Sequence, residues 1–243
     1  MKSLWQEWLG AIAFYTCLPI SPRWPIQLAG AAKWCPWVGL VLGGMLWGVQ
    51  WLLDFLQVPS PVASAVLVAL WLALTGGLHL DGAMDTADGL AVRDQQRRLE
   101  VMADSRAGAF GVMAAMVILL LKVTSLSSLE KGSVLVWVLV LGRLAQVWAI
   151  ARYPYLKPQG TGQIHKTSGV FPRDFWPSGL LVLLLSFLLP LPLGQLLFGL
   201  LLILLIPAWF QSQLGGHTGD SYGAVVEWTE ALLLVAFTVG SAS

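Results

Sequence analysis

Charged residues are scarce in this chain of 243 residues. Asp, Glu, Lys and Arg together make up 11% of it, whereas a soluble domain carries about 25%. Hydrophobic residues make up 57%, and the mean hydropathy is +0.73. This composition excludes an ordinary soluble domain and predicts an integral membrane protein.

Cysteine is nearly absent, and there is no excess of positive charge. Cys17 and Cys35 offer neither a disulfide framework nor a metal-binding spacing, so we interpret both as small apolar residues. The formal net charge of +1 gives no reason to expect a nucleic-acid partner. The N-terminus has a charge but no long apolar run before a small-residue cleavage site, so we expect no cleaved signal peptide.

Long apolar runs predict an all-α fold, a polytopic helical bundle that forms one membrane domain over residues 1–243. We expect about seven transmembrane helices, over residues 34–55, 62–80, 107–126, 134–151, 175–189, 193–210 and 224–239. Residues 4–18 alternate polar and apolar residues, which predicts an amphipathic helix at the interface or a short buried one. Whether this segment crosses the bilayer stays open.

The distribution of basic residues predicts the orientation. With seven spans, one side of the membrane holds Lys2, Arg23, Lys33, Arg93, Arg97, Arg98, Arg106, Arg152, Lys157, Lys166 and Arg173. The other side holds Lys131 and, if it reaches that far, Lys122. The basic side should be cytoplasmic. The same count places residues 81–104, 152–177 and 215–223 together on that side, which predicts one composite site at the cytoplasmic face.

An acidic motif begins where the second apolar run ends. Asp81, Asp85 and Asp88 are spaced i, i+4 and i+7, so a helix would present all three carboxylates on one face. A divalent cation would relieve their repulsion, and the all-oxygen ligand set favours Mg²⁺ or Mn²⁺ over Zn²⁺. Asp104 could close the site from a second helix. The alternative is a solvated helix face without a metal.

Other polar residues near this motif are candidates for substrate contacts. His79 is a candidate proton acceptor, metal ligand or partner that orients Asp81, and the alternative is a histidine that is merely hydrogen-bonded. His217 and Asp220 lie in a second motif before the last span. Glu227 and Glu230 either share a face with Asp220 or pair with Arg143 inside the membrane.

Carboxylates that hold Mg²⁺ beside basic residues are typical of sites that act on a diphosphate. The basic and hydroxyl side chains that we expect to contact the substrate are Arg93, Arg98, Ser105, Arg106, Arg152 and Lys166. The alternative for each basic residue is a topology signal that contacts only lipid head groups.

Three motifs in this order resemble one enzyme family. They are His79-Leu-Asp-Gly-Ala-Met-Asp-Thr-Ala-Asp-Gly89, Arg98-Leu-Glu-Val-Met-Ala-Asp-Ser-Arg-Ala-Gly-Ala-Phe-Gly111 and Gly215-Gly-His-Thr-Gly-Asp-Ser-Tyr-Gly-Ala224. Together with Thr16-Cys-Leu-Pro19 and Arg152-Tyr-Pro-Tyr155, they resemble the adenosylcobinamide-GDP ribazoletransferases, also called cobalamin-5'-phosphate synthases. The resemblance covers essentially the whole chain.

The resemblance implies an Mg²⁺-dependent transferase at the bacterial inner membrane. A ribose hydroxyl of α-ribazole, or of its 5'-phosphate, would attack the phosphorus nearest the cobinamide in adenosylcobinamide-GDP, and GMP would leave. Asp81, Asp85, Asp88 and Asp104 are then the metal ligands, and Asp104 or Asp81 is the base. Membrane lipid is a further expected partner, while a homo-oligomer or a complex with other cobalamin-assembly enzymes stays open.

Three other functions remain as alternatives. Asp85-Thr-Ala-Asp-Gly-Leu-Ala-Val-Arg93 resembles the Asp-x-x-Asp-Gly-x-x-Ala-Arg pattern of CDP-alcohol phosphatidyltransferases, with Val92 in place of Ala. The later half of that pattern is missing where Met102 and Arg106 stand. A transporter would place acids near mid-membrane and show an internal repeat, and we find no clear repeat. A non-catalytic scaffold for cobinamide-processing enzymes is the third.

Overall fold

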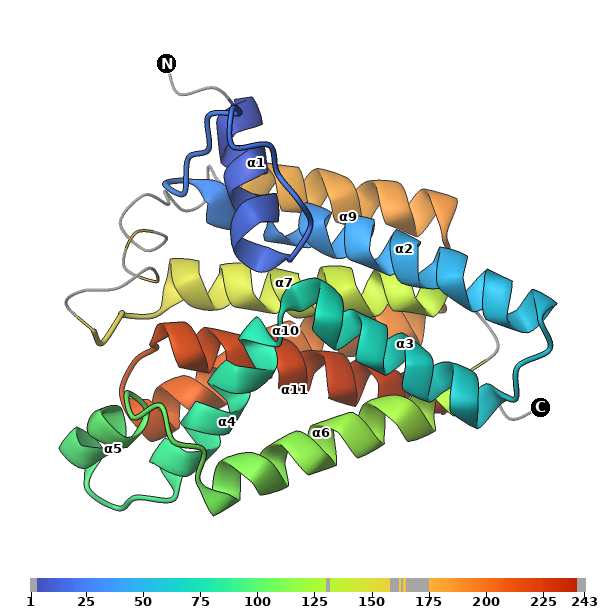
Figure 1. Ribbon diagram of the computed structural model, residues 1–243. Helices are drawn as coiled ribbons and strands as arrows, with labels where there is room; N and C mark the ends of the chain where they lie inside the picture. The colour runs from blue at the N-terminus through green and yellow to red at the C-terminus, as the bar shows by residue number, and fades with distance from the viewer. Residues whose placement is uncertain (1–3, 130–131, 158–161, 163, 165–174, 240–243) are drawn as a thin grey trace.

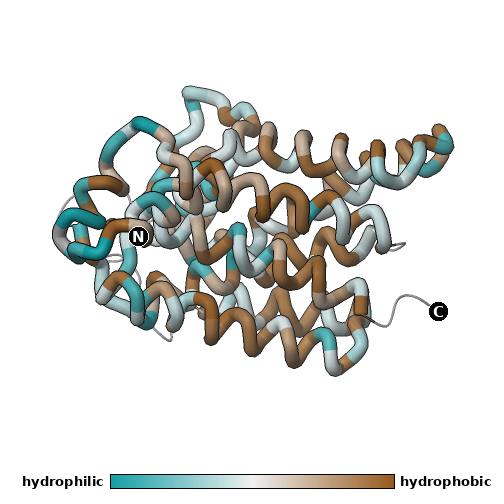
Figure 2. The backbone as a smooth tube through the Cα atoms, turned by 90° about the horizontal axis from the view of Figure 1, so that it is seen from below, coloured by the Kyte–Doolittle hydropathy of each residue, from teal (hydrophilic) through white to brown (hydrophobic). Residues whose placement is uncertain are grey.

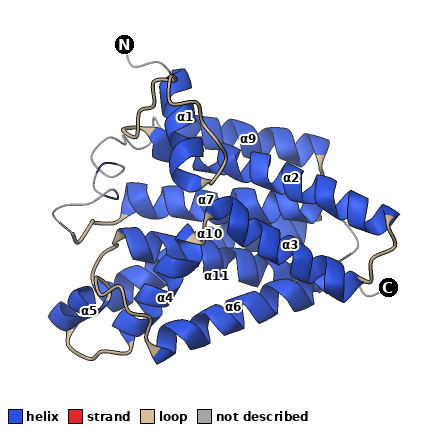
Figure 3. Ribbon diagram, viewed as in Figure 1, coloured by secondary structure: helices blue, strands red, loops and turns tan. Residues whose placement is uncertain are grey.

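The computed structural model describes residues 4–129, 132–157, 162, 164 and 175–239. In these residues the regular structure is helical, as Figure 3 shows, apart from one isolated bridge between Tyr155 and His217. In chain order the elements in Figure 1 are α1 (Leu4–Tyr15), η1 (Ala31–Trp34), α2 (Cys35–Phe55), α3 (Ser60–Thr75), α4 (Leu78–Leu90), α5 (Gln95–Val101), α6 (Ala109–Ser127), α7 (Ser133–Arg152), α9 (Trp176–Leu188), α10 (Leu193–Leu214) and α11 (Gly219–Thr238). The predicted all-α bundle is confirmed.

In the part of the chain that the structure describes, four helices are individually long and apolar enough to cross a membrane: α2 together with η1, α6, α7 and α10. The pair α3 and α4 adds a fifth candidate if it counts as one bent span. This count is below the predicted seven. Helix α9 has only 13 residues, and α11 carries Glu227 and Glu230 in its middle. Both helices nevertheless belong to the bundle and run in the same general direction as α7 in Figure 1.

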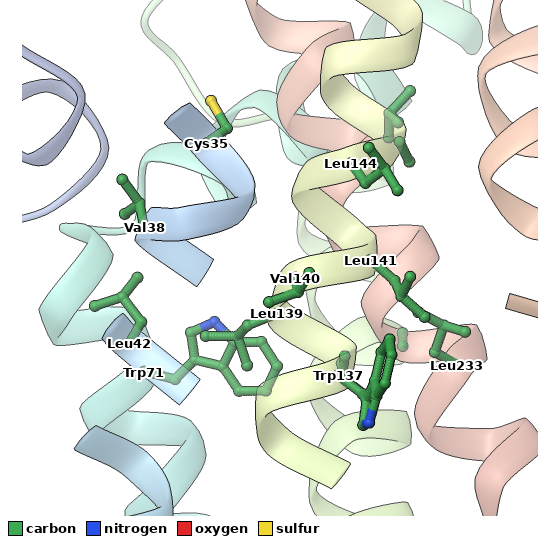
Figure 4. Packing of buried hydrophobic residues seen from close by; sticks show 14 of the residues in the cluster. Cys35, Val38, Leu42, Trp71, Trp137, Leu139, Val140, Leu141, Leu144 and Leu233 are labelled. Carbon is green, nitrogen blue, oxygen red and sulfur yellow. The ribbon is translucent and has the colours of Figure 1, made fainter. Parts of the chain in front are cut away.

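Helix α7 forms the centre of the bundle. Nearly all of its residues from Val134 to Ile150 are buried, and its side chains pack against α2, α10 and α11, as Figure 4 shows in part. Gly39 and Gly43 let α2 approach α7 closely. A Cβ on Gly39 would lie 2.5 Å from the carbonyl oxygen of Leu139, and one on Gly43 2.6 Å from Cα of Val136. Small residues at such positions are typical of helix contacts in membranes.

The outer surface of the bundle is apolar along most of its length. Large hydrophobic side chains are exposed on α2, α6, α9 and α10, including Trp51, Phe55, Leu120, Phe187 and Leu193. A soluble monomer rarely exposes so much contiguous apolar surface, so this face is suited to lipid. Figure 2 shows hydrophilic residues gathered mainly at one end of the bundle, the left end in this view and in Figure 1. We call it the hydrophilic end.

The chain bends by 90° between α3 and α4. Gly76 and Gly77 both have positive φ, 61° and 70°, a left-handed conformation that glycine adopts without strain. The predicted second span, residues 62–80, is therefore wrong at its end, because α3 stops at Thr75. Helix α4 is too short and too acidic to cross a membrane alone, and we treat it as lying outside the spanning helices.

Helix α1 runs crosswise to α2 at the hydrophilic end, as Figure 1 shows. It has 12 residues, which is too short to span a bilayer. One of its faces buries Leu9, Ile12 and Tyr15, while Trp5 on another is 55% exposed. A salt bridge of 2.6 Å from Lys33 Nζ to Glu7 Oε2 ties α1 to η1. The predicted amphipathic N-terminal helix is present.

A buried charge network crosses the interior of the bundle. Lys122 of α6 donates to Glu227 at 2.8 Å and to Glu230 at 2.7 Å, and Arg143 of α7 donates to Glu230 at 2.7 Å. The predicted pairing of Arg143 is thus confirmed for Glu230, while Glu227 pairs with Lys122 instead. Lys122 is 2% exposed, so it does not belong to the outer loops. Ionisable groups inside a membrane protein pair in this way because an isolated charge there is costly.

Candidate active site at the hydrophilic end

Helix α4 presents its three aspartates along one face, as their spacing predicts. Asp81 is exposed, and Asp85 and Asp88 are half-buried. Burial is the largest cause that raises the pKa of Asp85, and together with the negative charges of Asp81, Asp220 and Asp88, against the opposing charge of Lys157, it brings the pKa to about 6. Carboxylates from α4 and α11 therefore lie close enough to repel one another.

Two glycines bring α4 and α11 into contact. A Cβ on Gly82 would lie 2.6 Å from the carbonyl oxygen of Asp220, and one on Gly223 would lie 2.8 Å from that of His79. The N-terminus of α11 is fixed by a capping box in which Thr218 and Ser221 bond each other's backbone N–H groups. The two glycine contacts hold the first turn of α11 against the start of α4, next to Asp81.

The segment after α7 joins this region from a third direction. Lys157 Nζ lies 2.8 Å from Asp220 Oδ2. The backbone of Leu156 donates to His217 at 2.8 Å, and that of His217 donates to Pro154 at 2.9 Å. The three segments expected to converge therefore do meet, within the part of the chain that the structure describes. The predicted substrate contact Lys166 lies outside the described residues, as does Arg173.

Asp88 contacts the backbone rather than another side chain. Its carboxylate accepts from the N–H of Gly108 at 2.7 Å and from that of Gly111 at 2.8 Å, at the start of α6. The first N–H groups of a helix lack partners within the helix, and a carboxylate there also complements the helix dipole. Asp88 thus anchors α6 to α4, and its role as a metal ligand stays a prediction.

We expect Asp88→Ala to lower the free energy of unfolding by about 1–3 kcal/mol, because two part-buried N–H groups would lose their acceptor. Denaturant or thermal unfolding in detergent would measure the loss. The control is Asp54→Ala, an exposed position at the far end of α2, where a change below about 0.5 kcal/mol is expected. Equal stability of the two variants would argue against this anchoring role.

Asp104 lies in the turn between α5 and α6, and its described partner is Arg106. The guanidinium of Arg106 donates to both carboxylate oxygens, with Nη2 at 2.6 Å from Oδ2. These hydrogen bonds lower the pKa of Asp104. Ser105, Arg106 and Arg93 are exposed, in the connections that flank α5. The structure does not group Asp104 with the α4 carboxylates, so its metal-binding and catalytic roles stay predictions.

Three other predicted substrate contacts occupy different surroundings. Arg98 donates from Nε to the carbonyl of Val92 at 2.7 Å and from Nη1 to that of Gln213 at 2.5 Å, so it ties α5 to the end of α10. His217 is fully buried, with ring nitrogens 3.0 Å from Ser221 Oγ and 3.2 Å from the Pro207 carbonyl. Arg152 is exposed at the end of α7. The first two have evident structural roles, and only Arg152 is open to a ligand.

His79 is buried at the start of α4, where its ring stacks on Tyr15 with centroids 6.2 Å apart. Burial lowers its pKa, and the charges of Arg143 and Lys122 lower it further, so the imidazole is neutral. Its Nε2 has no hydrogen-bond partner in the described residues. A neutral buried imidazole can accept or donate a single hydrogen bond.

Two residues beside His79, namely Gln146 and Tyr222, were not predicted from the sequence, and Lys157 was not assigned to the site. Gln146 and Tyr222 line the same small cavity as His79, Asp81 and Asp220. A signal for Gln146 existed, because an amide inside an otherwise apolar span is costly unless it has a partner or a function. Tyr222 carried no comparable signal, because a tyrosine near a span end is ordinary.

The donor set at this end fits a magnesium ion. Asp81, Asp85 and Asp220 offer only oxygen ligands, and their mutual repulsion is what a bound cation would relieve. Among the described residues, no three His, Cys, Asp or Glu side chains lie close enough to hold one ion together. Magnesium is commonly bound by one or two carboxylates, with water and substrate phosphates completing the coordination.

Comparison with known proteins decides the family. The profile of a family described as cobalamin-5-phosphate synthase matches residues 7–238. The chain belongs to the cobalamin-5-phosphate synthase family. Within this family, it is 50% identical to the adenosylcobinamide-GDP ribazoletransferase of Synechococcus elongatus, over 99% of each chain. It is 45% identical to that of Trichormus variabilis, over 98% of this chain and 99% of the relative.

A more distant member has the same printed name. The adenosylcobinamide-GDP ribazoletransferase of Desulfitobacterium hafniense is 38% identical, over 97% of each chain. No solved structure is significantly similar to the chain. The family resemblance predicted from the three motifs is confirmed, and the cobalamin-5-phosphate synthase fold is seen here as a helical bundle with its polar residues gathered at one end.

Proposed function

We propose that this protein transfers the adenosylcobinamide-phosphate group from adenosylcobinamide-GDP to α-ribazole or α-ribazole 5'-phosphate, with release of GMP. The products are adenosylcobalamin or its 5'-phosphate. Membership of the cobalamin-5-phosphate synthase family and the names of its relatives support this reaction. The structural observation that carries the proposal is the packing of α4 against the first turn of α11, which brings the charge of Asp220 to act on Asp85 together with those of Asp81 and Lys157.

The carboxylates of Asp81 and Asp85 would hold Mg²⁺, with Asp220 nearby and with Asp88 and Asp104 as the remaining candidates. When bound, the ion would neutralise charge on the diphosphate during displacement. Lys157 offsets part of the negative charge at Asp220, so the carboxylate cluster does not repel the substrate at full strength. Exposed Arg93 and Arg106 at the same end are positioned to attract the diphosphate from solution.

The sequence left two candidates for the base, Asp81 and Asp104, and Asp81 is the better one. It is exposed beside the cavity that His79 and Asp220 also line. Asp104 is already hydrogen-bonded to Arg106, which lowers its pKa and weakens it as a base. In the proposed step, the acceptor hydroxyl gives its proton to Asp81, its oxygen bonds to phosphorus, and the bond to GMP breaks.

The apolar helices and their exposed hydrophobic surface make this a membrane protein. We place it in the bacterial inner membrane with its hydrophilic end toward the cytoplasm. The support is that the elements at this end in Figure 1 carry the basic residues: α5 and its flanking connections contain Arg93, Arg97, Arg98 and Arg106, and the end of α7 and the segment after it contain Arg152 and Lys157. Soluble nucleotide substrates would then reach the aspartates directly from the cytoplasm.

Product analysis tests the reaction. Purified protein with Mg²⁺, adenosylcobinamide-GDP and α-ribazole should release GMP and form an adenosylcobalamin product, without any partner protein. The same preparation with a CDP-linked lipid and an alcohol should release no CMP. CMP release without GMP release would favour the phosphatidyltransferase alternative, and turnover that needs added partners would favour the scaffold alternative.

A further inference from the structure

A small cavity opens between α1, α4, α7 and α11, next to the proposed metal-binding carboxylates. Its volume is about 120 Å³, and its lining includes His79, Asp81, Gln146, Asp220 and Tyr222. Whole drug-sized ligands occupy cavities of about 300–1,000 Å³. This cavity is therefore too small for a corrin or for a guanine nucleotide, and it suits a fragment about the size of one sugar ring.

Three buried polar groups of the lining have no partner among the described residues. They are His79 Nε2, Gln146 Oε1 and the Tyr222 hydroxyl. Their residues are 2%, 5% and 2% exposed. At least about 90% of buried polar groups in proteins are hydrogen-bonded, and each exception destabilises the fold. Three exceptions from α4, α7 and α11 around one cavity indicate that its occupant supplies their hydrogen bonds.

The charges around the cavity restrict the chemistry of that occupant. Among the lining residues that the structure describes, the charged ones are Asp81 and Asp220, and Lys157 pairs with Asp220. The buried wall is formed by groups that can accept or donate hydrogen bonds, namely an imidazole, an amide and a phenol. An apolar group would leave these polar atoms unpaired, and a phosphate would meet no cationic side chain among the lining residues that the structure describes. A neutral polyhydroxyl group satisfies both conditions.

We propose that this cavity binds the ribose of the acceptor, with sugar hydroxyls hydrogen-bonded to His79, Gln146 and Tyr222. This inference rests on the proposed function, and it identifies where the nucleophile sits. A ribose in the cavity places its attacking hydroxyl beside Asp81, where the proposed base and cation are. The base of the nucleoside then lies outside the cavity, toward the solvent at the hydrophilic end.

Two variants that remove hydrogen-bonding atoms with little change of shape test the proposal. We expect Tyr222→Phe and Gln146→Leu each to raise KM for α-ribazole by about 3- to 10-fold, the effect of one lost hydrogen bond. KM for adenosylcobinamide-GDP should stay unchanged. The control is Tyr153→Phe, which removes a phenol hydroxyl outside the cavity lining and should alter neither KM. Thermal unfolding in detergent establishes that each variant is folded.

Acceptor analogues identify the sugar as the group bound. In the wild type, 2'-deoxy-α-ribazole or 5'-deoxy-α-ribazole should show a raised KM. For at least one of them, Tyr222→Phe or Gln146→Leu should add no further loss, because the partner of the missing hydroxyl is already gone. Fully additive losses for both analogues would overturn the ribose assignment.

Other outcomes separate this inference from the function on which it rests. A wild-type enzyme that releases GMP, with variants that alter neither KM, would mean that the cavity holds only water and would overturn the sugar site alone. Variants that raise only KM for adenosylcobinamide-GDP would assign the cavity to the other substrate and also overturn it. A wild-type protein that releases no GMP with α-ribazole would overturn the proposed function itself.

Discussion

Replacing Asp85 with Asn is expected to reduce GMP release by at least about 10³-fold while leaving the protein folded. The negative charges of Asp81 and Asp220 both act on Asp85. The amide of Asn removes one negative ligand from the proposed cation site. A bound metal ion stabilises the transition state of phosphoryl transfer by several kcal/mol. Each loss of about 1.4 kcal/mol in that stabilisation lowers the rate tenfold. Initial rates of GMP release at saturating substrates measure the effect.

The matched control for this variant is Asp54→Asn. Asp54 is an exposed aspartate at the end of α2, away from the hydrophilic end. The Asp54→Asn variant carries the same chemical change, and its activity should equal that of the wild type. Stability provides the second comparison. Because the charges near Asp85 repel, Asp85→Asn should be at least as stable as the wild type. Wild-type activity in Asp85→Asn would remove this residue from the site.

Glu230→Ala is expected to cause the largest loss of stability, about 3–5 kcal/mol. Glu230 is 0% exposed and accepts from Lys122 and from Arg143, each at 2.7 Å. Its removal leaves Arg143 without a carboxylate and Lys122 with Glu227 alone. Breaking a buried pair leaves an uncompensated charge, which is why the loss exceeds the net contribution of the intact pair. Thermal unfolding in detergent, or the yield of folded protein, measures it.

Two further variants make this result specific. Glu100→Ala removes an exposed glutamate from α5 and should change the stability by less than about 0.5 kcal/mol. Glu230→Gln keeps the size of the side chain and some of its hydrogen bonds, so an intermediate loss is expected. If Glu230→Ala were as stable as Glu100→Ala, the network would not hold α6, α7 and α11 together.

The helical fold and the acidic face of α4 could be predicted from local patterns. The spacing of Asp81, Asp85 and Asp88 requires only helical periodicity to share a face. The bend before α4 was missed, because the apolar run continues past Gly76 and Gly77 to Leu80 and hydropathy alone does not detect a turn. Motifs far apart in the chain could be assigned to one end of the bundle because span counting fixes which loops share a side.

Tertiary contacts account for what the sequence could not predict. The spacing of Asp88 indicates a metal ligand, but only the folded chain brings the N–H groups of Gly108 and Gly111 to it. Lys122 was left as a possible member of the outer side, but the folded chain buries it in α6 against Glu227 and Glu230. The cavity residues Gln146 and Tyr222 belong to separate helices, and their common cavity exists only in the packed bundle.

The most direct test of the central claim is the binding of Mn²⁺, as a paramagnetic substitute for Mg²⁺, to purified protein with and without adenosylcobinamide-GDP. We predict that the wild type binds Mn²⁺ and that the bound ion broadens the diphosphate ³¹P signals. Asp85→Asn should lose both effects, while Asp54→Asn should retain them. Equal Mn²⁺ binding and equal ³¹P broadening in Asp85→Asn and the wild type would contradict the central claim.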